Sequence, residues 1–132
     1  MTKEISCFKA YDVRGRIPSE LNEDVAYRIG VGVVSYFAAE SVVVGFDVSP
    51  SSIDILNALT KGINSKGAKV YSIGLCGTEE IYFATNHLNT DAGVMITASH
   101  NPADYNGLKI VGKGAKPVSM DSGLDEIKNI AE

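Results

Sequence analysis

Apolar residues follow two patterns along the chain, one typical of helices and the other typical of strands that are buried on both faces. Between residues 25 and 37, apolar residues follow one another at intervals of four and form one face of a predicted helix. These residues are Val25, Ile29, Val33 and Phe37. The helix is expected to start just after Asn22, because an asparagine side chain can accept a hydrogen bond from the first helical turn.

A second helical pattern covers residues 50–66. Ser49 is its expected cap, and Pro50 suits the first helical position because proline lacks the N–H that would stay unpaired there. Gly67 is expected to end the helix, since glycine readily adopts the left-handed conformation. The predicted buried face consists of Ile55, Leu56, Leu59 and Ile63.

Two shorter helices are predicted in the rest of the chain. The first is capped by Thr78 and carries acidic residues in its first turn, where the helix dipole favours them. The second begins at Asp121 or Ser122. Its predicted inward-facing residues are Leu124, Ile127 and Ile130.

Four strands are predicted between the helices, over residues 41–46, 69–73, 92–97 and 106–111. The first is a β-branched run without alternation, which is typical of a strand covered on both faces in a parallel sheet. The fourth follows the third too closely for a connecting helix, so these two strands must be antiparallel if they pair. We therefore expect residues 1–132 to form one α/β domain, a three-layer α/β/α sandwich with a mixed, mostly parallel sheet.

The composition narrows the possible functions. Of the 132 residues, 45% are apolar and 21% are charged, and the formal net charge of −4 argues against a nucleic-acid binder that depends on bulk positive charge. The sequence has no apolar run of the ~20 residues that a membrane span needs, and residues 1–20 show no signal peptide. Cys7 and Cys76 lie far apart and match no metal-binding spacing. We therefore expect reduced thiols in a cytoplasmic protein that binds neither nucleic acid nor membranes.

The segment of greatest chemical interest is residues 97–102, with the sequence TASHNP. It directly follows a predicted strand, and ligand sites in open α/β sheets gather beyond the carboxyl ends of strands. Ser99 could act as a nucleophile or phosphate carrier, with His100 and Asn101 as neighbouring donors. The alternative is an ordinary polar turn, because serine and Asn-Pro pairs are common turn residues.

Several segments, in order along the chain, resemble the motifs of one enzyme family. Residues 97–102, together with residues 104–109 (DYNGLK), are similar to the active-site loop of the α-D-phosphohexomutases. Residues 8–15 look like the N-terminal signature of that family, and residues 44–47 match the start of a third motif. Residues 77–84 (GTEEIYFA) resemble bacterial phosphomannomutases in particular. The family fold has four domains, and this chain resembles the first.

The resemblance implies a reaction in which a phosphoryl group moves between the 1- and 6-positions of a hexose. Ser99 would carry the phosphoryl group, with a hexose 1,6-bisphosphate as the intermediate. A Mg²⁺ ion would bridge the phosphate on Ser99 to an acidic D-x-D-x-D loop, which this sequence does not contain. The chain alone is therefore expected to be inactive.

The same resemblance implies the partners. They are hexose phosphates, namely mannose or glucose 1- and 6-phosphate, and the remaining domains of a parent phosphomannomutase/phosphoglucomutase. Such an enzyme would supply GDP-mannose for surface polysaccharide. The sugar-selecting loop of the family lies in a later domain, so the choice between mannose and glucose is not made by these residues.

The resemblance also implies roles for charged and polar side chains. Arg14, in a segment that looks like a loop, would hold phosphate oxygens with its planar guanidinium; a surface ion pair with Asp12 is the alternative. Lys109 matches the candidate general acid/base of the family, but it could instead anchor phosphate as a fixed charge or be a solvated strand residue. His100 would position the phosphate or bond within the loop, and Asn101 would join the phosphate site and shape the loop.

One residue departs from the family pattern. Many members have an arginine where this chain has Ser49, in a G-x-D-x-R motif. Either Arg14 and Arg16 supply the missing positive charge, or the protein is a divergent member. The second possibility leaves an alternative function open, a stand-alone or remnant domain that binds sugar phosphates or a partner without catalysis. Phosphate on Ser99 would distinguish the two.

Overall fold

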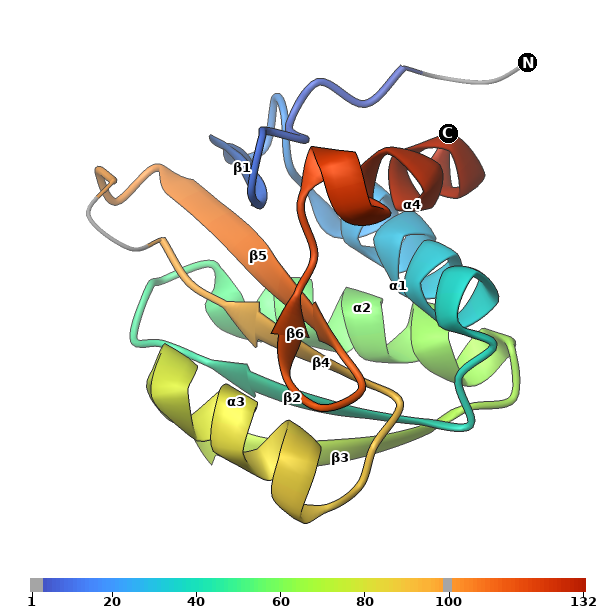
Figure 1. The fold of residues 1–132 in the computed structure, drawn as a ribbon. Helices are drawn as coiled ribbons and strands as arrows, with labels where there is room; N and C mark the ends of the chain where they lie inside the picture. Colours follow the sequence, from blue (N-terminus) through green and yellow to red (C-terminus); the bar gives the residue numbers. More distant parts are fainter. Residues whose placement is uncertain (1–3, 99–100) are drawn as a thin grey trace.

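A mixed six-stranded sheet forms the centre of the computed structural model, which describes residues 4–98 and 101–132 (Figure 1). Five strands lie in the order β1-β5-β4-β2-β3, and β6 pairs with β5. They are β1 (Val13–Arg16), β2 (Ser41–Phe46), β3 (Lys69–Leu75), β4 (Ala92–Ile96), β5 (Tyr105–Gly112) and β6 (Lys116–Pro117). β2 is parallel to β3 and β4, whereas β5 is antiparallel to β1, β4 and β6. Within the described ranges β5 alone runs against the other strands, so the predicted mixed, mostly parallel sheet is confirmed.

Helices cover both faces of this sheet, as predicted for a three-layer sandwich. Figure 1 shows α3 on one side of the sheet and α1, α2 and α4 on the other. The helices are α1 (Glu23–Phe37), α2 (Ser52–Ser65), α3 (Thr78–His87) and α4 (Leu124–Ala131), and a 3₁₀ turn, η1 (Met120–Ser122), precedes α4. In the described part of the chain, no helix is both long enough and apolar enough to span a membrane.

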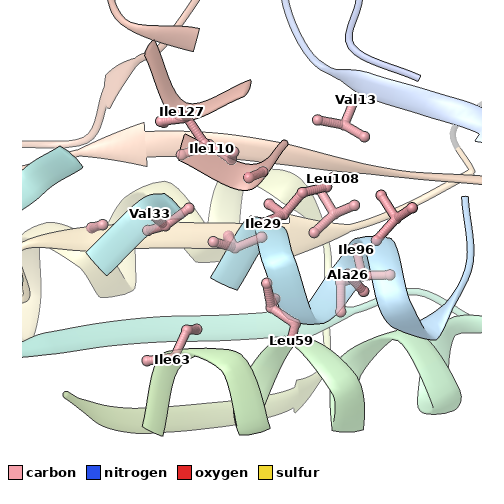
Figure 2. Close-up of a cluster of buried hydrophobic side chains, with 14 of the residues drawn as sticks. Val13, Ala26, Ile29, Val33, Leu59, Ile63, Ile96, Leu108, Ile110 and Ile127 are labelled. Carbon is pink, nitrogen blue, oxygen red and sulfur yellow. The ribbon is translucent and has the colours of Figure 1, made fainter. Parts of the chain in front are cut away.

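Two clusters of buried side chains hold the three layers together. The larger cluster lies between the sheet and the helices α1, α2 and α4, and Figure 2 shows side chains of these helices and of the strands meeting there. The smaller cluster is formed by Ile81 of α3 with Met95 and Val111 of the sheet. Successive residues of a strand point to opposite faces, so β4 and β5 contribute to both clusters. This explains why β4 is apolar without alternation and fully buried.

Glycines let α1 and α2 pack closely. A Cβ at Gly62 would overlap the carbonyl oxygen of Tyr27, and a Cβ at Gly30 would overlap that of Leu59. The two helix backbones therefore touch where these glycines meet. Alanine at either position would push the helices apart, because the contacting atoms belong to backbone that cannot rotate away.

The helix starts confirm one predicted cap and correct two others. The Oδ1 of Asn22 accepts the N–H of Val25 at 2.9 Å, so Asn22 caps α1 as predicted. The predicted start of α2 at Pro50 is wrong, because the helix begins at Ser52. Thr78 is the first residue of α3 rather than its cap, and the preceding Gly77 occupies the cap position.

The ends of other elements differ from the pattern-based expectations in similar ways. The last helix begins after η1, not at Asp121 or Ser122, and Ile130 is 41% exposed while Ala131 takes the inward position. β1 was not predicted at all, and Arg14, expected in a loop, lies on it. The predicted stop after residue 66 is confirmed within a residue, since Gly67 adopts a φ of +86°.

The two cysteines are ordinary thiols that form no disulfide. Burial raises the pKa of Cys7 to about 11, so this residue stays a neutral part of the core, as predicted. Cys76 is half-buried, and its Sγ lies 3.8 Å from the Sδ of Met95. Burial also raises the pKa of Cys76, with the nearby carboxylate of Glu80 acting in the same direction.

Candidate active site

Strands that run in one direction bring their carboxyl ends to one edge of the sheet. Arg16 is the last residue of β1, Asp47 follows β2, and Thr97 follows β4. Tyr105 begins the opposed strand β5 and pairs with Arg16. We call the edge marked by these four residues the carboxyl edge. It is the place where ligands bind in open α/β sheets.

Asp47 accepts four hydrogen bonds at the carboxyl edge. Its Oδ1 accepts the backbone N–H of Ser49 at 3.0 Å and the hydroxyl of Ser52 at 3.1 Å. Its Oδ2 accepts the hydroxyl of Thr97 at 2.8 Å and the backbone N–H of Ala98 at 3.1 Å. One carboxylate therefore joins the turn after β2, the first residue of α2 and the segment after β4.

These donors fix the charge of Asp47. Partial burial raises its pKa, but the hydrogen bonds from Ser49, Thr97 and Ser52 together outweigh burial and hold the pKa below its ordinary value. The side chain is therefore ionised at neutral pH. An ionised carboxylate offers acceptors only, which matches the four donors around it.

Asn106 forms a second junction beside Asp47. Its side chain is fully buried, and its Nδ2 donates to the hydroxyls of Ser51 at 2.9 Å and Ser52 at 3.1 Å. Its Oδ1 accepts the N–H of Gly107 at 2.8 Å, and the Gly107 carbonyl accepts the N–H of Thr97 at 2.9 Å. Asn106 thus ties the start of β5 to the start of α2.

Arg14 and Lys109 lie on neighbouring strands and on the same face of the sheet. Arg14 pairs with Gly107, which is two residues before Lys109 on β5, and side chains two residues apart on a strand share a face. A Cβ at Gly107 would crowd the Cγ of Arg14 at 3.0 Å and overlap the carbonyl oxygen of Val13. Glycine at this position therefore leaves room for the arginine side chain against the sheet.

The arginines of β1 are each engaged by a carboxylate. The Nε of Arg14 lies 2.9 Å from the Oδ1 of Asp12, so the alternative ion pair considered for Arg14 exists. The Nε of Arg16 lies 3.2 Å from the Oδ2 of Asp104, and its guanidinium carbon lies 5.4 Å from the ring centre of Tyr105. The ion pairs among the described residues do not include Lys109, which is half-buried.

The other predicted site residues follow β4. Ser99 and His100 lie outside the described residues. Asn101 is half-buried, and its N–H donates to the carbonyl of Ala98 at 3.0 Å. The structure therefore brings together the residues on both sides of Ser99, but it does not relate the Ser99 side chain to Arg14 or Lys109.

The described residues do not supply a metal site of their own. Across residues 4–98 and 101–132, no three His, Cys, Asp or Glu side chains come close enough to hold a metal ion. Asp47, whose carboxylate bonds residues 97 and 98 of the serine segment, already has its oxygens occupied by four donors. The observed donor set therefore does not fit a Mg²⁺ ion.

A pocket with a volume of about 270 Å³ lies away from the carboxyl edge. It is found where β5 ends, and its lining includes Phe37, Gly112, Lys113, Lys116, Pro117, Val118 and Ser122. Because Gly112 pairs with Ala92 at the start of β4, the pocket lies toward the opposite end of the strands. It does not contain any of the predicted site residues.

Comparison with known proteins assigns the chain to a family. A family model described as "Phosphoglucomutase/phosphomannomutase, alpha/beta/alpha domain I" matches residues 6–132. This chain belongs to the phosphoglucomutase/phosphomannomutase family. The matched part is domain I of the family, in agreement with the predicted resemblance.

Curated relatives of this domain I are bacterial phosphomannomutases. The chain is 53% identical to the phosphomannomutase of Salmonella typhimurium over 132 residues, all of this chain but 29% of that protein. It is 51% identical to a phosphomannomutase of Klebsiella pneumoniae over 129 residues, which are 98% of this chain and 82% of that protein. The chain thus spans less than a third of the length of the Salmonella relative.

Solved structures share the fold of this domain I. A phosphoglucomutase/phosphomannomutase family protein from Burkholderia thailandensis superposes with a TM-score of 0.88 at 30% identity, over 98% of this chain and 30% of that one. A protein described as a putative phosphomannomutase from Thermus thermophilus superposes with a TM-score of 0.87 at 27% identity, over all of this chain and 31% of that one. The α/β/α arrangement is therefore that of the family.

The hydrogen-bond network of the carboxyl edge was not predicted from the sequence. Asp47 was noted only as part of a motif, Asn106 was predicted to supply a turn into the next strand, and Ser52 was not singled out. The sequence did contain an indication of this network. Asp47 and the serines at positions 49, 51 and 52 directly follow a strand of apolar residues. Such a polar run at the end of a parallel strand predicts side chains that bond across the edge.

Proposed function

We propose that this domain I carries the phosphoryl group of a hexose-phosphate mutase on Ser99. The observation that supports this most directly is the position of the segment containing Ser99. The segment leaves β4 at the carboxyl edge; β5, which carries Lys109, pairs with β4, and β1, which carries Arg14 on the same face, pairs with β5. A phosphorylated serine in this position would find positive charge on the adjoining strands.

The proposed chemistry consists of two phosphoryl transfers, one from Ser99 to the sugar and one from the sugar back to Ser99. A sugar hydroxyl of a hexose monophosphate attacks the phosphorus on Ser99, the bond to the serine oxygen breaks, and a hexose 1,6-bisphosphate forms. The bisphosphate then turns over and returns its other phosphoryl group to the serine. Phosphoryl transfer depends mainly on positioning and charge stabilisation, so cations are the protein groups that matter most.

Arg14 and Lys109 are the cations we assign to this reaction. A phosphoserine carries about −1.5 to −2 charges at neutral pH, and the guanidinium of Arg14 can bind two of its oxygens at once. The existing ion pair of Arg14 with Asp12 would hold the guanidinium in orientation while a phosphate is absent. We assign to Lys109 the exchange of a proton with the sugar hydroxyl, and to His100 and Asn101 the positioning of the phosphate.

The remaining parts of the site are proposed to come from outside this chain. A Mg²⁺ ion supplies positive charge to transferring phosphoryl groups, and its carboxylate ligands would have to come from another domain, since the described residues offer none. The 132-residue chain alone is therefore expected to lack mutase activity. We further propose mannose phosphates as the substrates, GDP-mannose supply as the role and the cytoplasm as the location.

The test is a mutase assay on the intact enzyme that contains this domain. Replacing Ser99 with alanine (Ser99→Ala) is expected to reduce kcat by at least about a thousandfold, because the phosphoryl carrier is removed. Ser65→Ala is the matched control, since the hydroxyl of Ser65 only bonds the carbonyl of Gly62 within α2. Equal activity of the Ser99→Ala and Ser65→Ala enzymes would refute the proposed role of Ser99.

A non-catalytic sugar-phosphate-binding domain is the second candidate function. Ser49 in place of the arginine of the family motif favours it, because one expected cation at the carboxyl edge is missing. In this structure the N–H of Ser49 instead bonds Asp47. A binding domain would retain affinity for hexose phosphates after Ser99→Ala and would have no mutase activity before the substitution.

A further inference from the structure

The hydrogen bonds around Asp47 extend to Ala98, the residue directly before Ser99. We propose that Asp47 is a positioning residue for phosphoryl transfer, which holds the start of the serine segment against the first turn of α2. This inference rests on the proposed function, because it assigns a role to Asp47 in the same reaction. Asp47 itself does not touch the transferred group in this account; it acts through Thr97 and Ala98.

The donors to Asp47 come from two separate parts of the chain. Those on Oδ1, from Ser49 and Ser52, belong to the turn after β2 and to the start of α2. Those on Oδ2, from Thr97 and Ala98, belong to the segment that leads into Ser99. The carboxylate is therefore a bridge, and each of its oxygens binds one side.

A second path of hydrogen bonds closes the bridge into a ring. Ser52 accepts from Asn106, whose neighbour Gly107 accepts the N–H of Thr97. Thr97 in turn donates to Asp47. Thr97 is thereby held by its backbone from β5 and by its side chain from Asp47, so both its position and its orientation are fixed.

The arrangement requires a carboxylate rather than an amide. The four groups that bond Asp47 among the described residues are all donors, and an ionised carboxylate has acceptor sites for all of them. An asparagine could accept on one side only, and its NH₂ group would face the donors on the other side. The lowered pKa of Asp47 keeps the carboxylate ionised at neutral pH.

A misplaced serine segment would affect the rate more than substrate binding. Phosphoryl transfer needs the reacting oxygen and phosphorus within a few tenths of an ångström of their productive arrangement, and a misplacement of ~1 Å can reduce a rate about a hundredfold. The phosphate and sugar contacts assigned to Arg14 and Lys109 do not pass through Asp47. Loss of the bridge should therefore reduce kcat and leave KM nearly unchanged.

Asp91 provides a matched control at the opposite end of the sheet. It is half-buried like Asp47, and its Oδ2 accepts the N–H groups of Glu40 at 2.8 Å and Ser41 at 3.3 Å. Both bonds use the same oxygen of Asp91. The carbonyl oxygen of an asparagine side chain can therefore accept them, and its NH₂ group does not have to point at an N–H donor. Asp91→Asn removes the same charge as Asp47→Asn but leaves the serine segment untouched.

The experiment measures kcat and KM for hexose 1-phosphate in the intact enzyme carrying Asp47→Asn or Asp91→Asn. We expect Asp47→Asn to lower kcat about 10- to 100-fold and to change KM by less than about threefold. The Asp91→Asn enzyme should stay within about twofold of the unsubstituted enzyme in both. Thermal unfolding of each variant establishes that the folded fraction is the same in the assay.

Two milder variants keep the test valid if Asp47→Asn does not fold. Thr97→Val removes the side-chain donor on the serine side of the bridge, and Ser52→Ala removes the side-chain donor on the α2 side. Each is expected to lower kcat about 3- to 10-fold, since each removes one of the hydrogen bonds that hold the bridge. If Asp47 acts as a bridge, both variants should lower kcat, even though Ser52 is not adjacent to Ser99 in the sequence.

The outcomes separate this inference from the proposed function. If the unsubstituted enzyme has no mutase activity that depends on Ser99, the proposed function fails, and the role of Asp47 in it fails too. If that activity exists but Asp47→Asn and both milder variants retain the kcat of the Asp91→Asn enzyme, the positioning role of Asp47 is overturned while the function stands. A kcat loss confined to Asp47→Asn, Thr97→Val and Ser52→Ala supports the inference.

Discussion

The two ends of the central sheet use carboxylates in different ways. At the carboxyl edge, both oxygens of Asp47 bind groups from two separate parts of the chain, including the hydroxyls of Ser52 and Thr97. At the other end, which we call the amino edge and which is marked by Asp91 and the first residues of β2 and β4, one oxygen of Asp91 binds two adjacent backbone N–H groups. The first arrangement joins side-chain hydroxyls and backbone N–H groups from two distant segments, and the second binds two consecutive backbone N–H groups.

This difference indicates what each edge is for. Side-chain networks that are buried and fully bonded fix one geometry, but they lose it when any member is removed. A carboxylate that accepts only backbone N–H groups mainly provides hydrogen-bond partners for groups that would otherwise be unpaired near the end of a strand. We infer that the amino edge contributes to stability alone, whereas the carboxyl edge contributes both to stability and to the placement of the serine segment.

Among the variants that test this comparison, Asn106→Ala is expected to have the largest effect on the free energy of unfolding. The substitution leaves the hydroxyl of the fully buried Ser52 without its donor and removes the acceptor for the N–H of Gly107. Leaving buried polar groups unpaired costs about 1–3 kcal/mol, so the free energy of unfolding should fall by about 2 kcal/mol. Urea unfolding of the 132-residue chain measures this.

Asn86→Ala is the control for that measurement. Asn86 is exposed on α3, so its removal should change the free energy of unfolding by less than about 0.5 kcal/mol. Equal losses for the two variants would mean that the Asn106 network contributes nothing beyond ordinary polar contacts. The carboxyl edge would then not differ from the rest of the surface.

A smaller effect is expected from Thr90→Val beside the amino edge. The buried hydroxyl of Thr90 donates to the carbonyls of Thr85 and Ala92, and the Thr85 carbonyl keeps a bond from the N–H of residue 90. The free energy of unfolding should therefore fall by about 1 kcal/mol, with kcat unchanged in the intact enzyme. A kcat loss as large as that of Thr97→Val would contradict the division between the two edges.

The smallest expected effect is a pH dependence of stability that comes from Asp47. Its pKa is lower in the folded chain than the ordinary value of about 3.9, so its ionised form stabilises the fold. This contribution is fully present above the unfolded pKa and is lost as the pH falls through the folded pKa. Thermal unfolding between about pH 6 and pH 3 should therefore bring the melting temperatures of the unsubstituted and Asp47→Asn chains closer together at the acid end.

A gap in melting temperature that stays constant over this range would show that the charge of Asp47 does not stabilise the fold. A gap that widens toward acid pH would mean that the pKa of Asp47 is raised, not lowered. The Asp91→Asn chain serves as the reference for general acid effects.

Much of the fold was predictable from the sequence because it rests on local and periodic signals. The apolar runs of β2 and β4, the four-residue spacing in α1 and its Asn22 cap each depend on residues close together in the chain. The short separation between β4 and β5 predicted that the two strands would be antiparallel if they paired, and they do pair in this way. The resemblance to the α-D-phosphohexomutases then predicted the family that the comparisons show.

The missed features depend on partners far away in the sequence. β1 is only four residues long, and its charged residues alternate with Val13 and Gly15, so its strand character appears only beside β5. α2 begins at Ser52, whose hydroxyl bonds Asp47 and Asn106, and the contact with Asn106 comes from a distant part of the chain. Asn106 resembles a turn residue in isolation and becomes a buried junction only when α2 packs against β5.

The most direct test of the account is whether phosphate is found on Ser99 in the enzyme purified from its own cells. Mass spectrometry of the peptide that contains residues 97–102 gives the occupancy before and after incubation with hexose monophosphate. The account predicts phosphate on Ser99 that is lost to the sugar during incubation, with hexose 1,6-bisphosphate restoring it. Absence of phosphate from Ser99 in every preparation, or phosphate that hexose monophosphate never removes, would contradict the claim that this domain carries the phosphoryl group.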